Sequence, residues 1–463
     1  MESVGLDNAA LIDAATGAVT THADLAEHGR SFAHEVGARG LAFVFADTTV
    51  STIANYHAAR AAGHAVALLD AGLAPDLSAA LLERYRPDII VGPEQLRVPA
   101  GYQARLPGVW RQPQPGPTLH PDVAVLLTTS GSTGSPKFVR LSYANIDANT
   151  QAIVRSLGLT STDRAVTTLP LFYSYGMSVV NSHLAVGGSI LVLGASVIEP
   201  LFWDAVREHE VTFLNGVPAT FAMFARVGLA ERAAASVRAL TQAGGHLSEE
   251  LIDRFAGVMA ARRGEMFVMY GQTEAAPRIS CRPVVQTMTR AGSVGQALEG
   301  GHVSIVDEHG CVLPPGSIGN VVYSGPNVML GYCEDAADLA LGDVQGPALQ
   351  TGDRGRLDAD GFLYLTGRTK RITKIAGMRV SLDELEQLAA GPGPVAAVTA
   401  GEEGAVVFCE WPVGTDLSGP QRALLRHLRL PPRSVILRHV EVLPRLSSGK
   451  VDYPTLSGEV QSR

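Results

Sequence analysis

The sequence has few cysteines, no long apolar run and no excess of positive charge. Its four cysteines form no CxxC pair, which excludes the usual zinc-site spacing and a disulfide framework. No apolar stretch approaches the roughly 18 residues that a transmembrane helix needs, and no basic segment precedes an apolar one at the N-terminus, so we expect no signal peptide. With 37 Lys and Arg against 45 Asp and Glu, the net charge is −8, which argues against nucleic acid as a partner. We therefore expect a cytoplasmic protein with no membrane or nucleic-acid partner.

The chain does have enough apolar sequence for a large core. Its 463 residues, 46% of them hydrophobic, suffice for roughly two to four domains. Apolar runs such as Leu41–Phe45 and Asp88–Val91 alternate with Ala-rich stretches such as Ile53–Ala62. This alternation predicts an α/β fold with mainly parallel sheets.

The last third of the chain changes character twice. From 293 to 365, Gly and Pro interrupt short apolar runs, which predicts a β-barrel-like subdomain of short strands. A basic stretch, GRTKRITK, begins at Gly367 and indicates a domain boundary. We therefore expect a large N-terminal core over residues 1–368, which contains the barrel-like part, and a small, mobile α+β domain over residues 371–463.

A Gly/Ser/Thr loop follows an apolar stretch that predicts a buried strand. The segment Thr128–Lys137 reads TTSGSTGSPK, with two glycines and six hydroxyl residues before the lysine. Backbone N–H groups, hydroxyls and an ammonium can converge on a polyphosphate from such a loop. It is not a Walker A loop, because Lys137 follows a proline and the glycines stand too close together. A solvated turn is the alternative interpretation.

Four further motifs follow in order along the chain. Met269–Glu274 (MYGQTE) combines an aromatic ring, a hydroxyl and a carboxylate, and Thr351–Asp353 (TGD) places a carboxylate in a turn. The segment from Gly367 to Lys370 adds two cations, and Leu446–Lys450 (LSSGK) ends a Gly/Ser loop on a lysine. Each motif alone has an ordinary interpretation as a turn or a surface charge, whereas their joint occurrence in this order does not.

Together these motifs resemble those of the adenylate-forming superfamily, which comprises acyl-CoA synthetases, peptide-synthetase adenylation domains and luciferases. The loop is similar to TSGTTGxPK, with Ser132 in place of one Thr, and the next two motifs are similar to YGxTE and TGD. Gly367–Ser381 is similar to GRxKxxIKxxGxRVS, with Thr373 where Ile is usual. The resemblance covers nearly the whole chain, although the segment before the loop is shorter than is usual in these enzymes.

The resemblance implies adenylation of a carboxylic acid by ATP with release of pyrophosphate, with Mg²⁺ as cofactor and CoA as co-substrate. The residues that it assigns to the β and γ phosphates are Thr129, Ser130, Gly131, Ser132, Thr133, Gly134 and Lys137. Those that it assigns to the nucleoside are Tyr270, Gly271, Gly244, Gly245 and His246 around the adenine, and Asp353 and Arg368 at the ribose. For His246, hydrogen bonding to the substrate and plain packing both stay open.

The resemblance also implies which residues catalyse the two steps. Thr273 would bond the α-phosphate, Glu274 would ligate Mg²⁺, and Lys450 would neutralise charge that grows on the α-phosphoryl oxygens. Because adenylation and thiol transfer make consecutive demands on the small C-terminal domain, we expect that domain to rotate as a rigid body between them. The residues assigned to the thiol entry and to the hinge are Lys374 and Gly377, and Lys370.

The expected acid pocket departs from the family pattern. Tyr173 stands where many acyl-CoA synthetases carry His, with a core aromatic as the alternative, and Tyr143 also replaces a usual His. Ser174 stands where peptide-synthetase domains carry the Asp that holds an α-ammonium, so α-amino acids are expected to be poor substrates. A substituted aromatic acid should suit the pocket at least as well as a fatty acid. The expected walls are Tyr173, Ser174, Tyr175, Met177, Asn215, Gly216 and Val217.

Three functions are compatible with these motifs. The first is an ATP-dependent carboxylate–CoA ligase. The second keeps the adenylation chemistry but changes the acceptor or the nucleophile: a carrier protein, an amine, or nitrite as in ATP-dependent diazotases. The third is a non-catalytic nucleotide-binding paralogue, which the joint presence of Lys137, Glu274, Asp353, Arg368 and Lys450 disfavours. The acid, the acceptor and the oligomeric state are not readable from the sequence.

Overall fold

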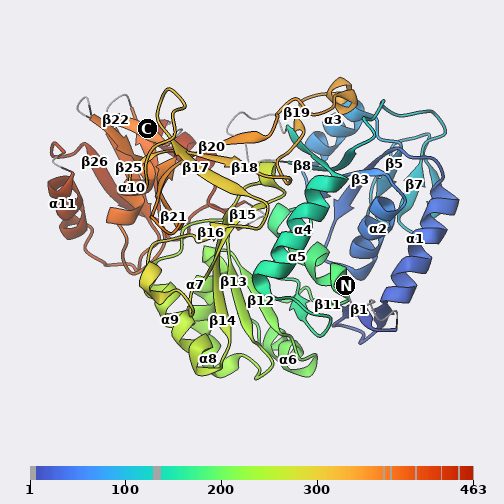
Figure 1. Cartoon of the computed structure of the whole chain (residues 1–463), viewed down its shortest axis with the longest axis horizontal. Coiled ribbons are helices and arrows are strands. Elements are labelled where there is room, and N and C mark those ends of the chain that lie inside the picture. Colours follow the sequence, from blue (N-terminus) through green and yellow to red (C-terminus); the bar gives the residue numbers. More distant parts are fainter. Residues whose placement is uncertain are drawn as a thin grey trace. The chain divides into compact units, whose positions relative to one another are not determined.

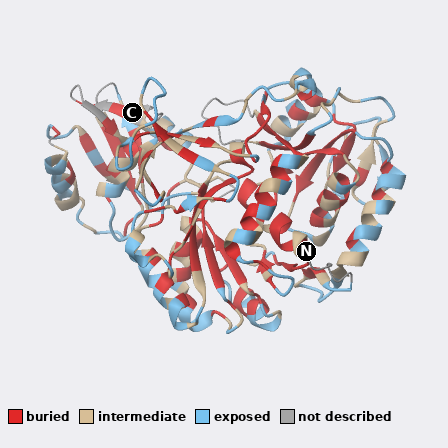
Figure 2. Ribbon diagram, in the orientation of Figure 1, coloured by how far each residue is buried: buried red, intermediate tan, exposed pale blue. Residues whose placement is uncertain are grey.

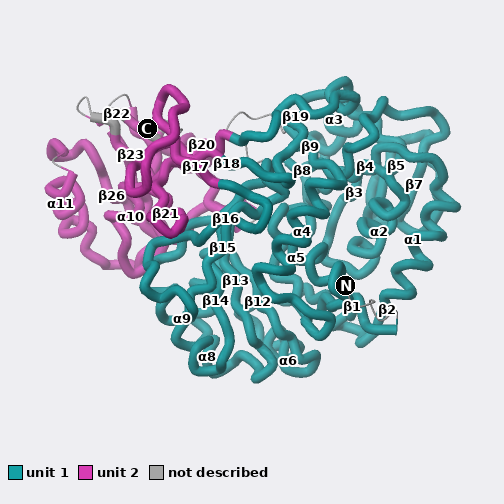
Figure 3. The backbone as a smooth tube through the Cα atoms, viewed as in Figure 1, with its two compact units in different colours: residues 1–302, 323–349 teal, residues 303–322, 350–463 magenta. Residues whose placement is uncertain are grey.

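A computed structural model describes residues 7–128, 137–368, 371–375, 378–401, 404–428, 430–446 and 449–461. The chain forms two compact units, residues 1–302 with 323–349, and residues 303–322 with 350–463 (Figure 3). The expected domain boundary near residue 370 stays a prediction. Several predicted site residues lie outside the described residues, namely Thr129, Ser130, Gly131, Ser132, Thr133, Gly134, Lys370, Gly377 and the side chain of Lys374.

The larger unit contains two sheets. The first has the strand order β16-β15-β14-β13-β12-β10-β11-β1-β2 among the described residues. Neighbouring strands pair in parallel from β1 through β11, β10, β12 and β13 to β14, whereas β15 runs antiparallel to β14. The strands are β1 (Ala9–Asp13), β2 (Val19–Thr21), β10 (Arg164–Val166), β11 (Ser189–Val192), β12 (Phe213–Gly216), β13 (Ala239–Gln242), β14 (Glu265–Gly271), β15 (Arg278–Pro283) and β16 (Gln296–Ala297).

The second sheet of this unit has the order β19-β9-β8-β4-β3-β5-β7-β6 within the described part of the chain. Its central strands β5, β3, β4 and β8 are parallel, and their near-continuous apolar sequences suit strands that are covered on both faces. The strands are β3 (Leu41–Ala46), β4 (Ala65–Asp70), β5 (Ile89–Val91), β6 (Gln103–Leu106), β7 (Val109–Arg111), β8 (Val123–Thr128), β9 (Phe138–Ser142) and β19 (Gly331–Cys333).

Helices cover these sheets, and polar residues define where several of them begin. Thr21 and Ser142 cap α1 and α4 with reciprocal side-chain bonds to the third helical residue, a capping box that satisfies free N–H groups. The helices are α1 (His22–Val36), α2 (Val50–Ala61), α3 (Pro75–Tyr85), α4 (Tyr143–Leu157), α5 (Ser174–Ala185), α6 (Pro200–Glu208), α7 (Pro218–Val227), α8 (Leu229–Arg232) and α9 (Glu249–Ala261), with short 3-10 turns η1 (Thr273–Ala275), η2 (Met288–Arg290) and η3 (Ala336–Ala340).

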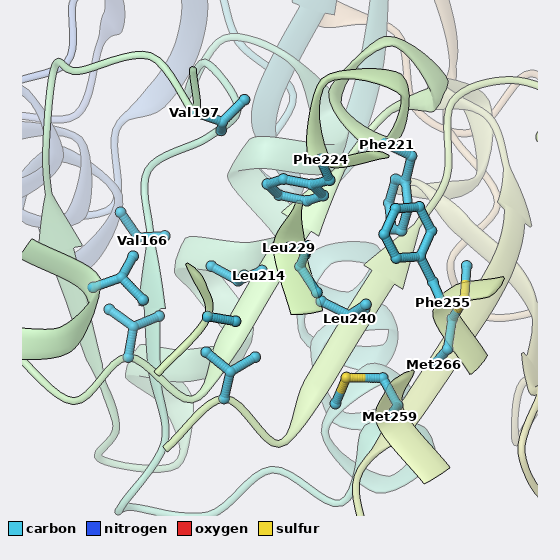
Figure 4. Close-up of a cluster of buried hydrophobic side chains, with 14 of the residues drawn as sticks. Val166, Val197, Leu214, Phe221, Phe224, Leu229, Leu240, Phe255, Met259 and Met266 are labelled. Carbon is cyan, nitrogen blue, oxygen red and sulfur yellow. The ribbon is translucent and has the colours of Figure 1, made fainter. Parts of the chain in front are cut away.

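A large apolar cluster fixes the first sheet against α6, α7 and α9 (Figure 4). Phe221 and Phe224 of α7 and Phe255 of α9 are buried, and their rings meet edge to face. Leu214 and Leu240 supply the sheet side of the cluster. Figure 2 shows the same burial along the central strands. Each buried side chain of this size stabilises the fold by roughly 1.5–3 kcal/mol, so the strands that end at the site are held rigidly.

The smaller unit is built mainly from two sheets. One has the order β17-β18-β20-β21, from β17 (His302–Val306), β18 (Gly319–Ser324), β20 (Ala348–Leu357) and β21 (Leu363–Arg368), and matches the expected short-strand region (Figure 1). The rest comprises the β22–β23 hairpin and the sheet β24-β25-β26 with its helices. These elements are β22 (Ile372–Ile375), β23 (Met378–Ser381), α10 (Leu382–Leu388), β24 (Val395–Ala400), β25 (Gly404–Cys409), α11 (Ser418–His427), β26 (Val435–His439) and α12 (Tyr453–Gln461).

The predicted α/β class is confirmed by this architecture. In the described part of the chain, no helix is long and apolar enough to cross a membrane.

Candidate active site

The predicted pocket and adenine motifs gather at one edge of the first sheet. The parallel strands β12, β13 and β14 end at neighbouring positions, with Gly216 beside Gln242 in the register. Ligands of open α/β sheets bind outside the carboxyl ends of such strands. The N-terminus of α5 reaches the same edge, since the Thr273 hydroxyl donates to the Ser174 hydroxyl over 3.4 Å. The predicted α-phosphate ligand and the predicted acid pocket are therefore neighbours.

Tyr332 joins two motifs that the sequence analysis treated separately. The Lys137 ammonium lies 3.6 Å from the centroid of the Tyr332 ring, and the Tyr332 hydroxyl donates to Glu274 Oε1 over 2.8 Å. The backbone N–H of Met329 also donates to the Glu274 carbonyl over 2.9 Å. The phosphate-loop lysine and the predicted metal ligand thus share one partner. We did not expect Tyr332, because strand pairing between β19 and β9 places it there, and no local sequence signal encodes that pairing.

The electrostatics of this group suit a nucleotide site. Burial, and then the Glu274 charge, raises the pKa of Tyr332 well above its usual value, so the phenol stays neutral and donates. Oε1 of Glu274 accepts that bond, which leaves the second carboxylate oxygen for a cation. Mg²⁺ is held in proteins by one or two carboxylates with waters and substrate phosphates.

Glycines at this edge allow the backbone to approach its neighbours closely. Gly244 has a φ of +85°, and a Cβ there would lie 2.5 Å from the Tyr173 hydroxyl. A Cβ on Gly271 would lie 2.0 Å from the Pro277 carbonyl oxygen. Only glycine tolerates both conditions without rearrangement. Gly245 and the exposed His246 follow Gly244, and Tyr270 is buried at the end of β14.

Two of the predicted acid-pocket residues, Tyr175 and Asn215, are joined by hydrogen bonds through Thr241. The Tyr175 hydroxyl lies 2.7 Å from Thr241 Oγ1, and Thr241 Oγ1 donates to Asn215 Oδ1 over 2.6 Å. The rings of Tyr173 and Tyr175 meet edge to face, with centroids 6.3 Å apart. Burial raises the pKa of Tyr175 to about 12. Gly216 ends β12, Val217 precedes the first residue of α7, and Met177 is fully buried in α5.

Tyr143 has a structural role, since its hydroxyl donates a hydrogen bond to the His64 carbonyl over 3.0 Å.

The sequence analysis missed one further residue. Arg278, the first residue of β15, is buried with its guanidinium 4.8 Å from the Tyr175 ring centroid. Its place after the Met269–Glu274 motif was the available signal, but nothing in the sequence indicates that it is buried.

The smaller unit carries the predicted ribose ligands. Arg368 Nε donates to Asp353 Oδ1 over 2.9 Å, across the β20–β21 pair. The Thr351 hydroxyl donates to the Val321 carbonyl and accepts from the Asp353 N–H. Thr351–Asp353 lie within strand β20, so the expectation of a turn at this motif was wrong: pairing with β21 keeps this segment in the strand. The Lys450 carbonyl accepts from the Leu446 N–H over 2.8 Å in the expected Gly/Ser loop. The backbone of Lys374 pairs with Arg379 in the β22–β23 hairpin.

Comparisons with known proteins identify the family to which the chain belongs. The model of the AMP-binding enzyme family matches residues 3–333. Sulfoacetate–CoA ligase of Cupriavidus necator is 30% identical over 394 residues, which cover 81% of this chain and 75% of that one. Feruloyl-CoA synthase of an Amycolatopsis species is 30% identical over 385 residues, 80% of this chain and 74% of that one.

Solved structures share the fold at low identity. An anthranilate CoA ligase in complex with anthranoyl-AMP superposes with a TM-score of 0.80 at 20% identity, covering 99% of this chain and 95% of that one. The o-succinylbenzoate CoA synthetase of Bacillus subtilis, with its acyl-adenylate, gives 0.77 at 21% identity, covering 97% and 95%. The chain therefore belongs to the AMP-binding enzyme family of the adenylate-forming superfamily and is an AMP-forming ligase of the acid–thiol type.

Proposed function

We propose that the protein activates a compact carboxylic acid with ATP and transfers the acyl group to the thiol of CoA. In the first half-reaction, a carboxylate oxygen bonds to the α-phosphorus of ATP, the bond from that phosphorus to the β-phosphate breaks, and pyrophosphate leaves. In the second, the thiol gives up its proton, its sulfur bonds to the acyl carbon, and AMP leaves with the electron pair of the broken C–O bond.

The observation that carries this proposal is the shared contact of Lys137 and Glu274 with Tyr332. A lysine and a carboxylate held together in this way can receive the phosphates of a nucleotide and its cation. Mg²⁺, when bound, would neutralise phosphate charge, and Glu274 has a carboxylate oxygen available for it. Positioning and charge stabilisation suffice for such a reaction, since no covalent protein intermediate is required.

The other predicted site residues have side chains whose chemistry suits the roles proposed for them. Thr273, beside Ser174, can donate to the α-phosphoryl oxygen that faces the acid pocket. Asp353, held by Arg368, can accept from the ribose hydroxyls. Lys450 would stabilise the charge on the α-phosphoryl group, and Lys374 with Gly377 would admit the thiol after a rotation about Lys370.

The acid is proposed to be compact because Tyr173 lies against Gly244 and restricts the pocket. The relatives are named for compact acids of two kinds, aromatic in feruloyl-CoA synthase and indoleacetate–CoA ligase, and short and doubly acidic in sulfoacetate–CoA and oxalate–CoA ligases. An aromatic acid would pack against the two phenols.

The experiment is acid-dependent exchange of labelled pyrophosphate into ATP, measured over a panel of aromatic, aliphatic and dicarboxylic acids. Acid-dependent exchange without CoA, and acyl-CoA with AMP when CoA is added, are the expected results. If exchange occurs but CoA yields no thioester, and an amide or an acylated carrier protein forms instead, the proposed acceptor is wrong and the proposed adenylation stands. Absence of exchange with every acid would overturn the proposal.

A further inference from the structure

Arg278 is a buried cation beside Tyr175, one of the predicted acid-pocket residues. Its residue is 3% exposed. One guanidinium nitrogen, Nη1, contacts the Met269 thioether, and the other, Nη2, donates to the Ser178 hydroxyl over 3.3 Å. The plane of charge lies over the Tyr175 ring. These partners are all neutral, and the guanidinium retains donors beyond these two bonds.

No carboxylate pairs with Arg278 among the residues that the structure describes. Arg140, which is also fully buried in this unit, differs because its guanidinium donates to backbone carbonyls, including those of Leu330, Tyr332 and Gly342. Burial lowers the pKa of Arg278, and the groups that oppose this shift are Tyr175, Cys281 and Tyr173. Burial raises the pKa of Cys281 to about 12, so the thiol carries no charge that could compensate. A buried cation without an anion is costly unless a ligand supplies one.

A second donor in the same network also lacks a partner. Asn215 is 2% exposed, and its Nδ2 makes no hydrogen bond in the described structure. Its Oδ1 is occupied by Thr241, which in turn bonds Tyr175, the residue under Arg278. A buried guanidinium and a buried amide N–H group are therefore joined through Thr241 and Tyr175. Both call for acceptor atoms of a ligand.

Arg278, on β15, contacts α5 too far from its first turn to hold the reacting carboxylate. That carboxylate must meet the α-phosphate beside Thr273, which contacts Ser174 in the first turn of α5. Arg278 contacts Ser178, four residues later, and four helical residues span roughly 6 Å. This distance separates the two acidic groups of a short aliphatic diacid or of an aromatic diacid.

We propose that Arg278 binds a second anionic group of the substrate, so that the acid activated here carries a carboxylate or sulfonate in addition to the carboxylate that is adenylated. The inference rests on the proposed function and specifies its substrate class. Asn215 Nδ2 would donate to the same molecule, and the neutral phenols of Tyr173 and Tyr175 would contact the carbon skeleton between its two ends.

The test compares matched acids in wild-type protein: succinate with its monomethyl ester, phthalate and isophthalate with benzoate, and sulfoacetate with acetate. The readout is kcat/KM for pyrophosphate release. A preference for the doubly charged member is expected in the pair whose skeleton fits. Activity that is equal or higher with the singly charged member of every active pair would overturn the inference and leave the proposed function standing. Absence of release from all acids would overturn both.

Three variants assign the preference to the arginine. Arg278→Met should lower kcat/KM for the preferred diacid on the order of 10²- to 10³-fold, as expected when one partner of a buried charge pair is removed, with little change for the singly charged analogue. Arg278→Lys should restore part of the preference. Arg254→Met, which removes an exposed arginine from α9, is the matched control and should change neither value.

Stability separates this role from a structural one. If the anionic partner of Arg278 is the substrate, Arg278→Met should leave the melting temperature of the free protein unchanged or raise it, because the variant loses an uncompensated buried charge. A diacid without ATP should raise the melting temperature of the wild type and not that of Arg278→Met. A strongly destabilised variant together with equal loss of activity toward both members of a pair would contradict the assignment.

Discussion

Tyr332→Phe tests whether the contact between β19 and η1 prepares the nucleotide site. The change removes the hydroxyl that donates to Glu274 and keeps the ring that lies under Lys137. A hydrogen bond to a charged group contributes about 1.5–3 kcal/mol when it is well buried. Tyr332 is 36% exposed, so we expect the lower end of this range. Loss of a partner that orients a metal ligand typically weakens metal binding by about 10- to 100-fold, and the exposure again favours a factor near ten.

The assay is pyrophosphate exchange as a function of Mg²⁺ concentration at saturating acid. Tyr332→Phe should raise the Mg²⁺ concentration for half-maximal activity by roughly tenfold, with a smaller effect on the KM of the acid. Tyr332→Ala should add an increase in the KM of ATP, because Lys137 loses its ring. Tyr102→Phe is the control, since its hydroxyl donates only to the Pro87 carbonyl in the described structure. An unchanged Mg²⁺ dependence in Tyr332→Phe would refute the reasoning.

Three further outcomes are expected. Lys450→Ala should slow adenylation by a factor on the order of 10²–10³ in single-turnover assays and spare thioester formation from a presynthesised adenylate; equal loss in both would count against this role. Gly244→Ala should lower the melting temperature, because the left-handed φ costs about 1–2 kcal/mol and the new Cβ meets the Tyr173 hydroxyl. Tyr173→Phe should relieve part of that cost, and no relief would show that the clash is unimportant. α-Amino acids should give little pyrophosphate release, because Ser174 offers no charge to an ammonium; efficient use of one would contradict this.

Local sequence patterns predicted helices and strands correctly where a run of similar residues, apolar or Ala-rich, favours one kind of element. The apolar run Leu41–Phe45 lies in strand β3, and the Ala-rich stretch Ile53–Ala62 lies in α2 except for its last residue. Ordered motifs also singled out Glu274 and Asp353, whose roles in a site stay predictions. These features depend on residues that are close together in the chain, so the sequence carries them.

The features that sequence reasoning missed depend on distant pairing and burial. Tyr332 reaches Lys137 and Glu274 because β19 joins the edge of a sheet whose other strands precede it by far in sequence. Arg278 looks like a surface cation in the sequence, and only the packing of β15 against α5 makes it a buried one. The hinge at Lys370 and the thiol entry at Gly377 stay predictions.

The most direct test of the central claim follows an oxygen atom. The acid that supports pyrophosphate exchange is labelled with oxygen-18 in its carboxylate and incubated with the protein, ATP, Mg²⁺ and CoA, and the products are weighed by mass spectrometry. Attack of the carboxylate on the α-phosphorus predicts AMP that carries one labelled oxygen, acyl-CoA that retains the other in its thioester carbonyl, and unlabelled pyrophosphate. Label in orthophosphate with ADP as the nucleotide product, or AMP without label, would contradict the account.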